Sequence, residues 1–393
     1  MKLSSLAVRE PGVRTFNPPH QVPIVAASSF VFSSLEEGTA IFAGEQEGHI
    51  YGRFGNPTVE AAADKIAALE GYGLGRPVYG LFCSSGMAAI ATALLGVCSA
   101  GDKILTHADL YGGSSSLIDD LAGKGIARIT ADLRDTQGIE DLLAHDKKVR
   151  LIYLETPSNP TMRCTDISGL AALAHRHDCL LVVDNTFATP VVQQPLLHGA
   201  DIVVHSTTKY LNGHGSGVAG AIICHDEALY REKLLPTYRL YGGSGNPWDA
   251  WLVLNGLKTL PLRMERHCAN ALQLATHLLR HEQVNRVNYP GLSDHPDRPI
   301  ADKQMVDYGG MLSFELRDGA AASAFMNALR GCTLTPTLGD VDTLVLHPAT
   351  MSHRGIDPAV REAHGITDGL VRVSVGIEDI DDILGDIERA LIF

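Results

Sequence analysis

A lysine among small hydroxyl residues gives the clearest chemical signal in this chain. Ser206, Thr208 and Lys209 directly follow one apolar run, and Asp184 ends another. A lysine amine can form a Schiff base with pyridoxal phosphate (PLP), and nearby hydroxyls can bind its phosphate. A carboxylate beside the pyridine nitrogen raises the pKa of that nitrogen and keeps the ring an electron sink. The pattern therefore predicts a PLP site.

A turn at Ser85-Gly86-Met87 offers a second place for an anion. It ends an apolar run and opens a predicted helix over 86–97. Backbone N–H groups at a helix N-terminus bind phosphate readily. The same pattern is also an ordinary strand-to-helix turn, so the residues alone leave both interpretations open.

Two other motifs suggest competing chemistry. The segment 215–220 reads GxGxxG, which is typical of dinucleotide binding, but it precedes the strand-like 219–224 instead of following a strand. No ribose-binding acid stands about 20 residues further on. His175 and His177 form an HxH motif, but that spacing on a helix points the rings to different faces. We expect neither a nicotinamide or flavin enzyme nor a metal site.

Composition narrows the class of protein. The chain has 393 residues, 45% of them hydrophobic and 20% charged, which fits a globular enzyme of two or three domains. Its net charge of −13 and lack of basic clusters disfavour nucleic-acid and membrane partners. Seven scattered cysteines without CxxC spacing predict reduced core thiols. With no apolar leader or spanning segment, we expect a soluble cytoplasmic protein.

Apolar runs alternate with helical stretches along the middle of the chain. Strands are predicted near 78–83, 103–107, 126–131, 150–154, 180–184 and 202–205, with helices such as 86–97 and 166–177 between them. This order predicts an α/β fold with a mostly parallel, doubly wound sheet. Ligands bind beyond the carboxyl ends of such strands, where Asp184 and Lys209 fall.

The pattern divides the chain into three predicted regions. Residues 1–58 contain Pro11, Pro18, Pro19, Pro23 and Pro57 with little periodicity, which predicts an extended arm that packs on a neighbouring subunit. Residues 59–250 form the predicted cofactor-binding domain, opened by Asn56-Pro57 as the start of a helix that stops at Gly71. A long helical stretch over 248–281 leads into a smaller α/β domain within 251–393. That domain has predicted strands near 311–316, 332–335, 343–347 and 371–375 and an amphipathic last helix over 380–391.

An ordered series of motifs gives these signals a common source. The chain contains, in order, Tyr51-Gly52-Arg53, Asn56-Pro57-Thr58, Ser85-Gly86-Met87, Tyr111-Gly112, Thr156-Pro157-Ser158-Asn159-Pro160, Asp184-Asn185-Thr186, Ser206-Thr207-Thr208-Lys209-Tyr210, Leu338-Gly339-Asp340, His347-Pro348-Ala349 and Leu370 to Gly376. This series resembles the Cys/Met metabolism (trans-sulfuration) family of PLP-dependent enzymes over essentially the whole chain. The resemblance implies fold type I of PLP-dependent transferases, the aspartate aminotransferase-like fold. It also implies a homotetramer, a dimer of dimers with shared active sites.

The resemblance assigns expected roles to individual residues. Lys209 and Tyr111 are the implied catalytic residues, because Lys209 forms the Schiff base and moves protons while Tyr111 stacks on the cofactor ring. The cofactor-binding residues are Tyr51, Arg53, Ser85, Gly86, Met87, Tyr111, Asp184, Thr186, Ser206, Thr208 and Lys209, of which Tyr51 and Arg53 reach the neighbouring subunit's phosphate. The substrate-binding residues are Asn159, Thr337, Leu338 and Arg372, whose guanidinium suits a carboxylate.

The implied reaction is γ-elimination on a sulfur amino acid, which gives 2-oxobutanoate, ammonia and a thiol from methionine. Local motifs lean toward the methionine γ-lyase and cystathionine γ-lyase members. Three positions depart from the methionine γ-lyase pattern: Gly113 stands where a cysteine is common, Thr337 replaces a frequent serine and Asp342 a frequent glutamate. The alternatives are γ-replacement, as in an O-acylhomoserine sulfhydrylase or cystathionine γ-synthase, and a non-catalytic PLP-binding protein. The segment 236–247, interpreted as a loop at the pocket entrance, favours no single member.

Overall fold

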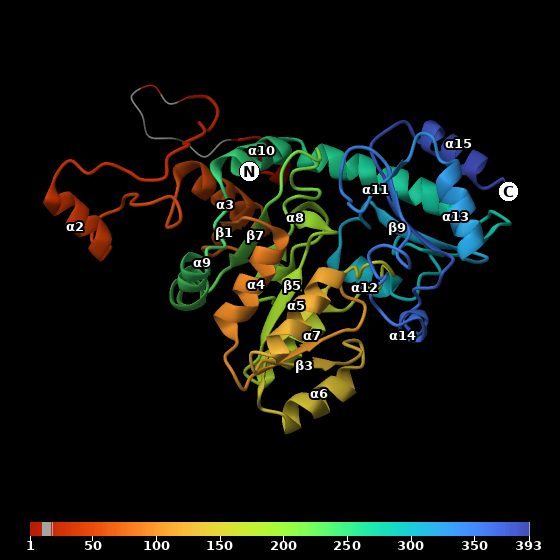
Figure 1. The fold of residues 1–393 in the computed structure, drawn as a ribbon, viewed down its shortest axis with the longest axis horizontal. Helices are drawn as coiled ribbons and strands as arrows, with labels where there is room; N and C mark the ends of the chain where they lie inside the picture. Colours follow the sequence, from red (N-terminus) through yellow and green to blue (C-terminus); the bar gives the residue numbers. More distant parts are fainter. Residues whose placement is uncertain (10–16, 18, 393) are drawn as a thin grey trace.

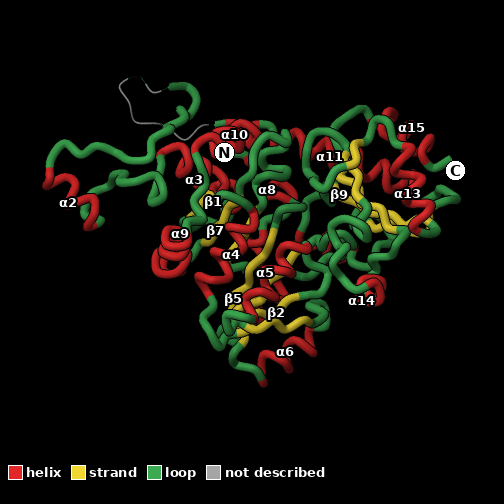
Figure 2. The backbone as a smooth tube through the Cα atoms, viewed as in Figure 1, coloured by secondary structure: helices red, strands yellow, loops and turns green. Residues whose placement is uncertain are grey.

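Two β-sheets with their helices organise this computed structural model, which describes residues 1–9, 17 and 19–392. Figure 1 traces the chain from an N-terminal segment that projects from one side, through the larger sheet, to the smaller sheet near the C-terminus. Figure 2 shows the strands of the two sheets as separate groups, with helices between and around them. The fold is the predicted α/β class with a mostly parallel sheet.

The larger sheet has the strand order β1-β7-β6-β5-β4-β2-β3. Its strands are β1 (Tyr79–Cys83), β2 (Lys103–Thr106), β3 (Ala127–Thr130), β4 (Val149–Glu155), β5 (Leu180–Asp184), β6 (Ile202–His205) and β7 (Gly220–Cys224). Adjacent strands from β3 to β6 pair in parallel, whereas β7 is antiparallel to both of its neighbours, β1 and β6. The strands predicted between 78 and 205 are thus confirmed to within a residue or two.

Helices cover both faces of this sheet, because alternate strand residues point to opposite faces. Ile152, Val183 and Val203 belong to one core and Tyr153, Val182 and Val204 to the other. Against the first core pack α3 (Pro57–Glu70), α6 (Thr136–His145), α7 (Ile167–Arg176), α8 (Thr189–Val192), the 3-10 helix Pro195–His198 and α10 (Pro247–Lys258). Against the second pack α4 (Gly86–Val97), α5 (Gly112–Ala122), the π-helix Leu229–Leu234 and α9 (Leu235–Tyr241).

Two predicted helix starts are confirmed by their caps. The Asn56 side chain accepts hydrogen bonds from the backbone N of Thr58 at 3.0 Å and of Val59 at 3.4 Å, with Pro57 in the first turn of α3. Ser85 caps α4 in the same way by accepting from the backbone N of Ala88 at 3.0 Å. Such caps satisfy N–H groups that have no partner within the helix.

The smaller sheet has the order β10-β11-β12-β9-β8. Its strands are β8 (Val284–Asn288), β9 (Met311–Leu316), β10 (Thr333–Leu334), β11 (Leu344–Leu346) and β12 (Leu370–Ser374). The C-terminal helices are α11 (Leu260–Leu278), α12 (Arg298–Gln304), α13 (Gly319–Ala328), α14 (Pro358–Ala363) and α15 (Ile380–Ala390). A separate apolar core joins the sheet to α11, α13 and α15.

Three expectations need correction. The stretch 248–281 is two helices, since α10 ends at Lys258 and Pro261, which lacks a backbone N–H, stands in the first turn of α11. Residues 1–58 are not wholly extended, because they include α1 (Leu3–Val8) and α2 (Leu35–Ala43), the latter capped by Ser34. The segment 236–247 is not all loop, because α9 reaches Tyr241. Pro11 and Pro18 lie outside the described residues.

Two further properties bear on the predicted class. All seven cysteines are buried free thiols, which agrees with their assignment to the core. In the described part of the chain, no helix has both the length and the apolar character needed to cross a membrane.

Candidate active site

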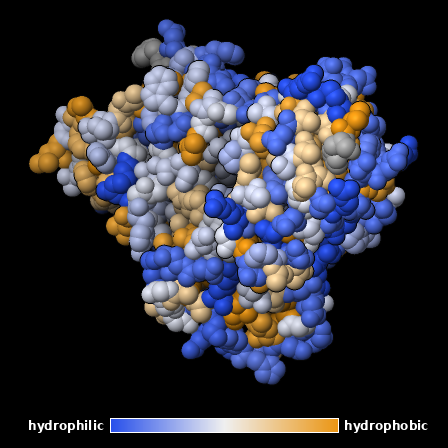
Figure 3. Space-filling model, turned by 45° about the vertical axis from the view of Figure 1, so that its right-hand side comes forward, coloured by the Kyte–Doolittle hydropathy of each residue, from blue (hydrophilic) through white to orange (hydrophobic). Residues whose placement is uncertain are grey.

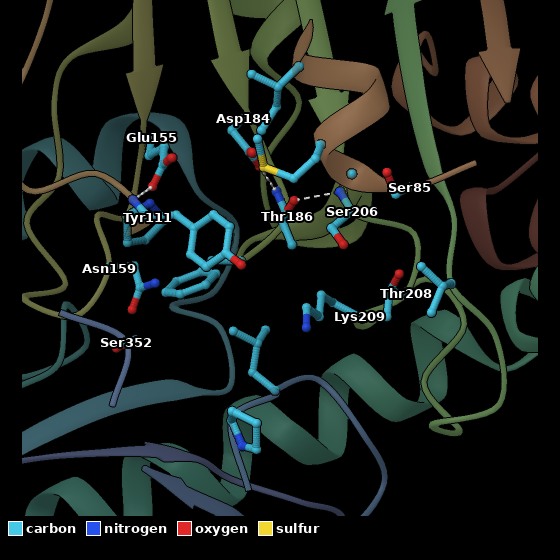
Figure 4. Close-up of a pocket in the computed structure, with 18 of the residues that line it drawn as sticks. Ser85, Tyr111, Glu155, Asn159, Asp184, Thr186, Ser206, Thr208, Lys209 and Ser352 are labelled. Carbon is cyan, nitrogen blue, oxygen red and sulfur yellow. Dashed lines mark hydrogen bonds between the residues drawn. The ribbon is translucent and has the colours of Figure 1, made fainter. Parts of the chain in front are cut away.

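A cavity of about 260 Å³ opens beyond the carboxyl ends of β4, β5 and β6. Figure 4 shows Asp184, Ser206 and Lys209 on one side of it, with Tyr111 and Asn159 on another. Of the predicted site residues, those that line it are Ser85, Gly86, Met87, Tyr111, Asn159, Asp184, Thr186, Ser206, Thr208, Lys209, Leu338 and Arg372. The structure therefore gathers side chains that lie up to 287 positions apart, from 85 to 372, around one space.

Lys209 extends its amine into this cavity from the turn after β6. The Nζ atom donates a hydrogen bond to Thr337 Oγ1 at 2.7 Å. Burial, followed by the positive charge of Arg372, lowers the pKa of Lys209 to about 8. The uncharged amine is the nucleophilic and basic form, so this environment makes that form accessible near neutral pH.

Asp184 is the last residue of β5 and lines the cavity. Oδ1 accepts a hydrogen bond from the Thr186 backbone N at 2.9 Å, and Oδ2 lies 3.3 Å from the Tyr153 hydroxyl. Burial raises the pKa of Asp184, while the bonds from Thr186 and the charge of His205 act in the opposite direction. A buried carboxylate of this kind is stabilised by a cationic partner such as a protonated ring nitrogen.

A small cradle lies between the start of α4 and the turn after β6. A Cβ placed on Gly86 would come within 2.8 Å of Ser206 Cβ and 3.0 Å of Ser206 Cα, so any larger residue would fill this space. The Thr186 hydroxyl accepts a hydrogen bond from the Ser206 backbone N at 2.8 Å. Hydroxyls and the N-terminus of α4 make the cradle suitable for a phosphate. Together with Asp184 and Lys209, its residues fit PLP.

Arg372 enters from β12 of the smaller sheet and is only 3% exposed. Its Nη1 donates to Asn159 Oδ1 at 3.1 Å and its Nη2 to the Thr337 carbonyl at 3.0 Å. Burial lowers the pKa of Arg372 to about 10, which still leaves it cationic at neutral pH. Both contacts are with neutral groups, so the guanidinium can attract a carboxylate ligand.

Several residues lining the cavity were not predicted. Glu155 ends β4, and its Oε2 accepts a hydrogen bond from the Tyr111 backbone N at 2.8 Å (Figure 4). A polar residue at the end of an apolar strand was the available signal, the same signal that identified Asp184. The other unpredicted lining residues are Ile90, Pro157, Phe187, Val218, Pro336 and Ser352.

Some predicted residues lie elsewhere. Tyr51 is 45% exposed, and Arg53 donates to the Arg239 carbonyl, with its guanidinium 4.5 Å from the Phe54 ring centroid. Neither residue lines this cavity. Thr337 does not line the cavity either, but it accepts hydrogen bonds from two residues that do, Lys209 and Arg372.

The competing motifs also have clear positions. His175 Nε2 lies 2.9 Å from Asp201 and His177 Nε2 lies 2.7 Å from Glu140, so the two rings contact different carboxylates. Residues 215–219 of the GxGxxG segment form a turn and loop ahead of β7, which begins at Gly220, as its sequence context predicted.

Comparisons with known proteins agree with this geometry. Residues 12–392 match the profile of a family described as Cys/Met metabolism PLP-dependent enzyme. The chain is 44% identical over 375 residues to an L-methionine gamma-lyase from Fusobacterium nucleatum subsp. polymorphum, covering 94% of this chain and 93% of that one. It is 44% identical to a cystathionine beta-lyase from Lactococcus lactis subsp. cremoris, covering 94% and 93%.

A solved structure has the same fold. The crystal structure of cystathionine gamma synthase from Xanthomonas oryzae pv. oryzae, in complex with aminoacrylate and cysteine, superposes with a TM-score of 0.92 at 40% identity. The match covers 100% of this chain and 98% of that chain. The similarity therefore extends over both sheets and the cavity between them.

Proposed function

Because the chain belongs to the Cys/Met metabolism family of PLP-dependent enzymes, we propose that it catalyses γ-elimination on a sulfur amino acid. The first substrate we propose is L-methionine, which would give 2-oxobutanoate, ammonia and a thiol. The observation that carries the proposal is the meeting of Lys209, Asp184 and Arg372 around one cavity. Identity of 44% to a relative named L-methionine gamma-lyase supports this choice of reaction.

The proposed cofactor position follows from the chemistry of the lining residues. Gly86, Met87, Ser206 and Thr208 would hold the phosphate, and Asp184 would pair with the ring nitrogen. When bound, PLP supplies an electron sink that stabilises negative charge at substrate carbons. Ser85 and Thr186 support the cradle through their bonds to Ala88 and Ser206.

Substrate orientation falls to the smaller sheet. Arg372 would bind the substrate carboxylate through its two-pronged guanidinium, with Asn159 and the Thr337-Leu338 backbone beside it. Lys209 would remove the α-proton and then move protons at the β and γ carbons, because its amine has a lowered pKa and lines the cavity. Thr337 Oγ1 would hold the amine between these steps, and Tyr111 would cover the ring face.

A direct assay tests this proposal. Purified enzyme with PLP is incubated with L-methionine, L-cystathionine or L-homocysteine, and 2-oxobutanoate is measured. Release from methionine without any added thiol is the expected result. Absence of 2-oxobutanoate with all three substrates would reject γ-elimination.

One position favours a second candidate, γ-replacement. A Cβ on Gly113 would lie 2.5 Å from Tyr111 Cε1 and 2.9 Å from Met87 Sδ, so a side chain there requires a different ring position. The similar Xanthomonas protein is a cystathionine gamma synthase. Consumption of O-acetylhomoserine only when a thiol is present would assign γ-replacement.

We further propose how the chain is assembled and where it acts. Residues 59–250 would form the cofactor domain and 251–393 the substrate domain, in a cytoplasmic homotetramer. The arm 1–58 would bring Tyr51 and Arg53 to a neighbouring subunit's phosphate. Exposed apolar residues Val31, Leu35 and Phe42 on and beside α2 support this assembly, and Figure 3 shows apolar surface on the projecting part of the molecule. Sedimentation velocity of the full chain tests the tetramer.

A further inference from the structure

Two carboxyls, one buried and one half-buried, lie side by side at the ends of β4 and β5. The parallel strand register pairs Glu155 with Asp184. Asp184 has a role in the proposed reaction, whereas Glu155 has none, although it lines the same cavity and is only 7% exposed. A buried carboxyl is costly unless its oxygens have partners, so the contacts of Glu155 indicate its purpose.

Glu155 fixes the start of helix α5. Tyr111 occupies the N-cap position of that helix, and its own side chain makes no capping bond. Glu155 Oε2 instead accepts from the Tyr111 backbone N at 2.8 Å, and Oε1 accepts from Ser114 Oγ at 2.8 Å. A carboxyl from a neighbouring strand therefore satisfies the backbone N–H of the N-cap residue, as the Glu of a capping box does, and it holds the backbone that carries the Tyr111 ring.

The Tyr153 hydroxyl connects this carboxyl to Asp184. It lies 3.4 Å from Glu155 Oε1 and 3.3 Å from Asp184 Oδ2, and Tyr153 is fully buried. Burial raises the pKa of Tyr153 well above its ordinary value, so the hydroxyl keeps its proton. A hydroxyl has one proton and can donate it to only one of the two carboxyls at a time.

From this geometry we propose that Glu155 and Tyr153 are positioning residues of the active site. Glu155 sets the place of Tyr111, and Tyr153 links Glu155 to the carboxylate that faces the cofactor ring. The inference rests on the proposed function, since it concerns how that site is held. It assigns roles to two residues on β4 that contact neither the phosphate cradle nor Arg372 among the described hydrogen bonds.

The surrounding charges define what each change would do. Glu155 faces Asp184 on β5, and its backbone N donates at 3.0 Å to Nε2 of His107, whose Nδ1 lies 2.7 Å from Asp109. Asp184 also faces His205 on β6, whose Nε2 lies 2.5 Å from Oε1 of the buried Glu70. Burial and the Asp184 charge raise the pKa of Glu155 to about 7.

Two substitutions should therefore separate the effect of Tyr153 on Asp184 from that of Glu155. Tyr153→Phe removes a hydrogen bond that favours the charged form of Asp184, so this pKa rises. Glu155 is neutral below its pKa of about 7, so Glu155→Gln removes no charge at acid pH and should leave the pKa of Asp184 nearly unchanged. Protonation of Asp184 removes the ionic partner of the cofactor ring. The acid limb of PLP retention, meaning the pH range over which the retained PLP falls as the pH is lowered, reports that event.

The experiment measures PLP retained by the holoenzyme against pH, from its visible absorption after gel filtration. We expect the acid limb to move up by about half to one pH unit in Tyr153→Phe and to stay close to that of the wild type in Glu155→Gln. Tyr289→Phe is the matched control, because it removes another buried hydroxyl. That hydroxyl donates to the Gly309 carbonyl at 3.0 Å and belongs to the apolar core of the smaller sheet. Its acid limb should coincide with that of the wild type.

A second readout tests the link to Tyr111. Glu155→Gln should lower kcat about tenfold, through a displaced ring, with a smaller change in KM. An acid limb of Tyr153→Phe that coincides with that of the wild type would overturn the proposal, as would an unchanged kcat in Glu155→Gln. If Glu155→Gln does not fold, Tyr153→Phe alone decides by the direction of its shift. Retention requires no substrate, so a wild type inactive on methionine would reject the proposed reaction while this assay still judges the inference.

Discussion

The two walls of the cavity are held in place by different means. The sheet wall, formed by Glu155, Asp184, Ser206 and Lys209, stands at the ends of β4 to β6, where strand register and backbone bonds such as Asn185 N to Val204 O at 3.0 Å fix each position. The far wall, formed by Pro336, Thr337, Leu338, Ser352 and Arg372, comes from the smaller sheet and its loops. Two hydrogen bonds connect the far wall to the rest of the cavity, from Arg372 to Asn159 Oδ1 at 3.1 Å and from Lys209 to Thr337 Oγ1 at 2.7 Å.

This difference separates chemistry from specificity. In the sheet wall, strand pairing fixes the backbone at Glu155 and Asp184, and the turn after β6 carries Ser206 and Lys209, so this wall suits the tasks of holding a cofactor and moving protons. The far wall can exchange loop residues at small structural cost.

In the sheet wall, the largest loss of activity is expected from Lys209→Ala. It removes the amine that would carry out each proton transfer, so turnover should fall by roughly 10⁴-fold or more. The measurement is 2-oxobutanoate release under substrate saturation. Lys124→Ala, a change at an exposed lysine, is the control. A Lys209→Ala enzyme within tenfold of wild type would remove Lys209 from the mechanism.

The far wall is tested by Arg372→Lys. A lysine keeps the charge but cannot bond Asn159, Thr337 and a carboxylate together, so KM should rise roughly 10- to 100-fold while PLP affinity changes little. Steady-state kinetics and PLP titration separate the two effects. The matched control is Arg317→Lys, where the arginine is exposed and paired with Asp318 at 3.1 Å. Equal loss of PLP and substrate affinity would show that the walls are not independent.

A smaller effect is expected where the sheet wall meets α4. Gly86→Ala places a methyl group against Ser206, so the PLP dissociation constant should increase about tenfold through crowding. Gly385→Ala in α15 has no atom within 4 Å of its new Cβ, and it should leave PLP binding unchanged while stabilising the helix by up to about 1 kcal/mol. Spectroscopic titration of both variants checks this pair.

The smallest effect concerns stability against pH in the apoenzyme. Folding lowers the pKa of Lys209 from 10.5 to about 8. Between these values the unfolded chain binds a proton that the folded chain does not, so this group makes the free energy of unfolding rise with pH. Lys209→Met should have a flatter slope than wild type over that interval in urea unfolding. Identical slopes would show that the lysine is not desolvated.

Much of the sheet wall could be predicted from sequence because position and chemistry coincide there. Asp184 and Lys209 each follow an apolar strand, and the carboxyl ends of parallel strands meet at one edge. Glu155 obeys the same rule because it ends β4, although it was not predicted as a site residue, whereas Asn159 in the motif directly after it was. The helix α2 also had a signal, since Ser34 and Glu37 have capping-box spacing that the surrounding prolines obscured.

The far wall could not be predicted by physical reasoning alone. Arg372 is a single cation inside the apolar strand β12, and only its tertiary partners Asn159 and Thr337 explain why it can be buried. Thr337 and Ser352 lie outside regular secondary structure, where periodicity gives no direction for a side chain. The expected roles of Arg372 and Thr337 came from family resemblance, which supplies contacts that local patterns do not contain, whereas Ser352 had no predicted role.

The burial of every cysteine has a chemical consequence for an enzyme whose proposed product is a thiol. Burial raises the pKa of Cys98 and of Cys224 to about 12 and that of Cys179 to about 11, so these sulfurs stay protonated at neutral pH. Disulfide exchange requires an accessible thiolate or disulfide. A thiol released from this cavity would therefore meet no reactive sulfur on the described surface, and we expect the enzyme to resist mixed disulfides with its proposed product.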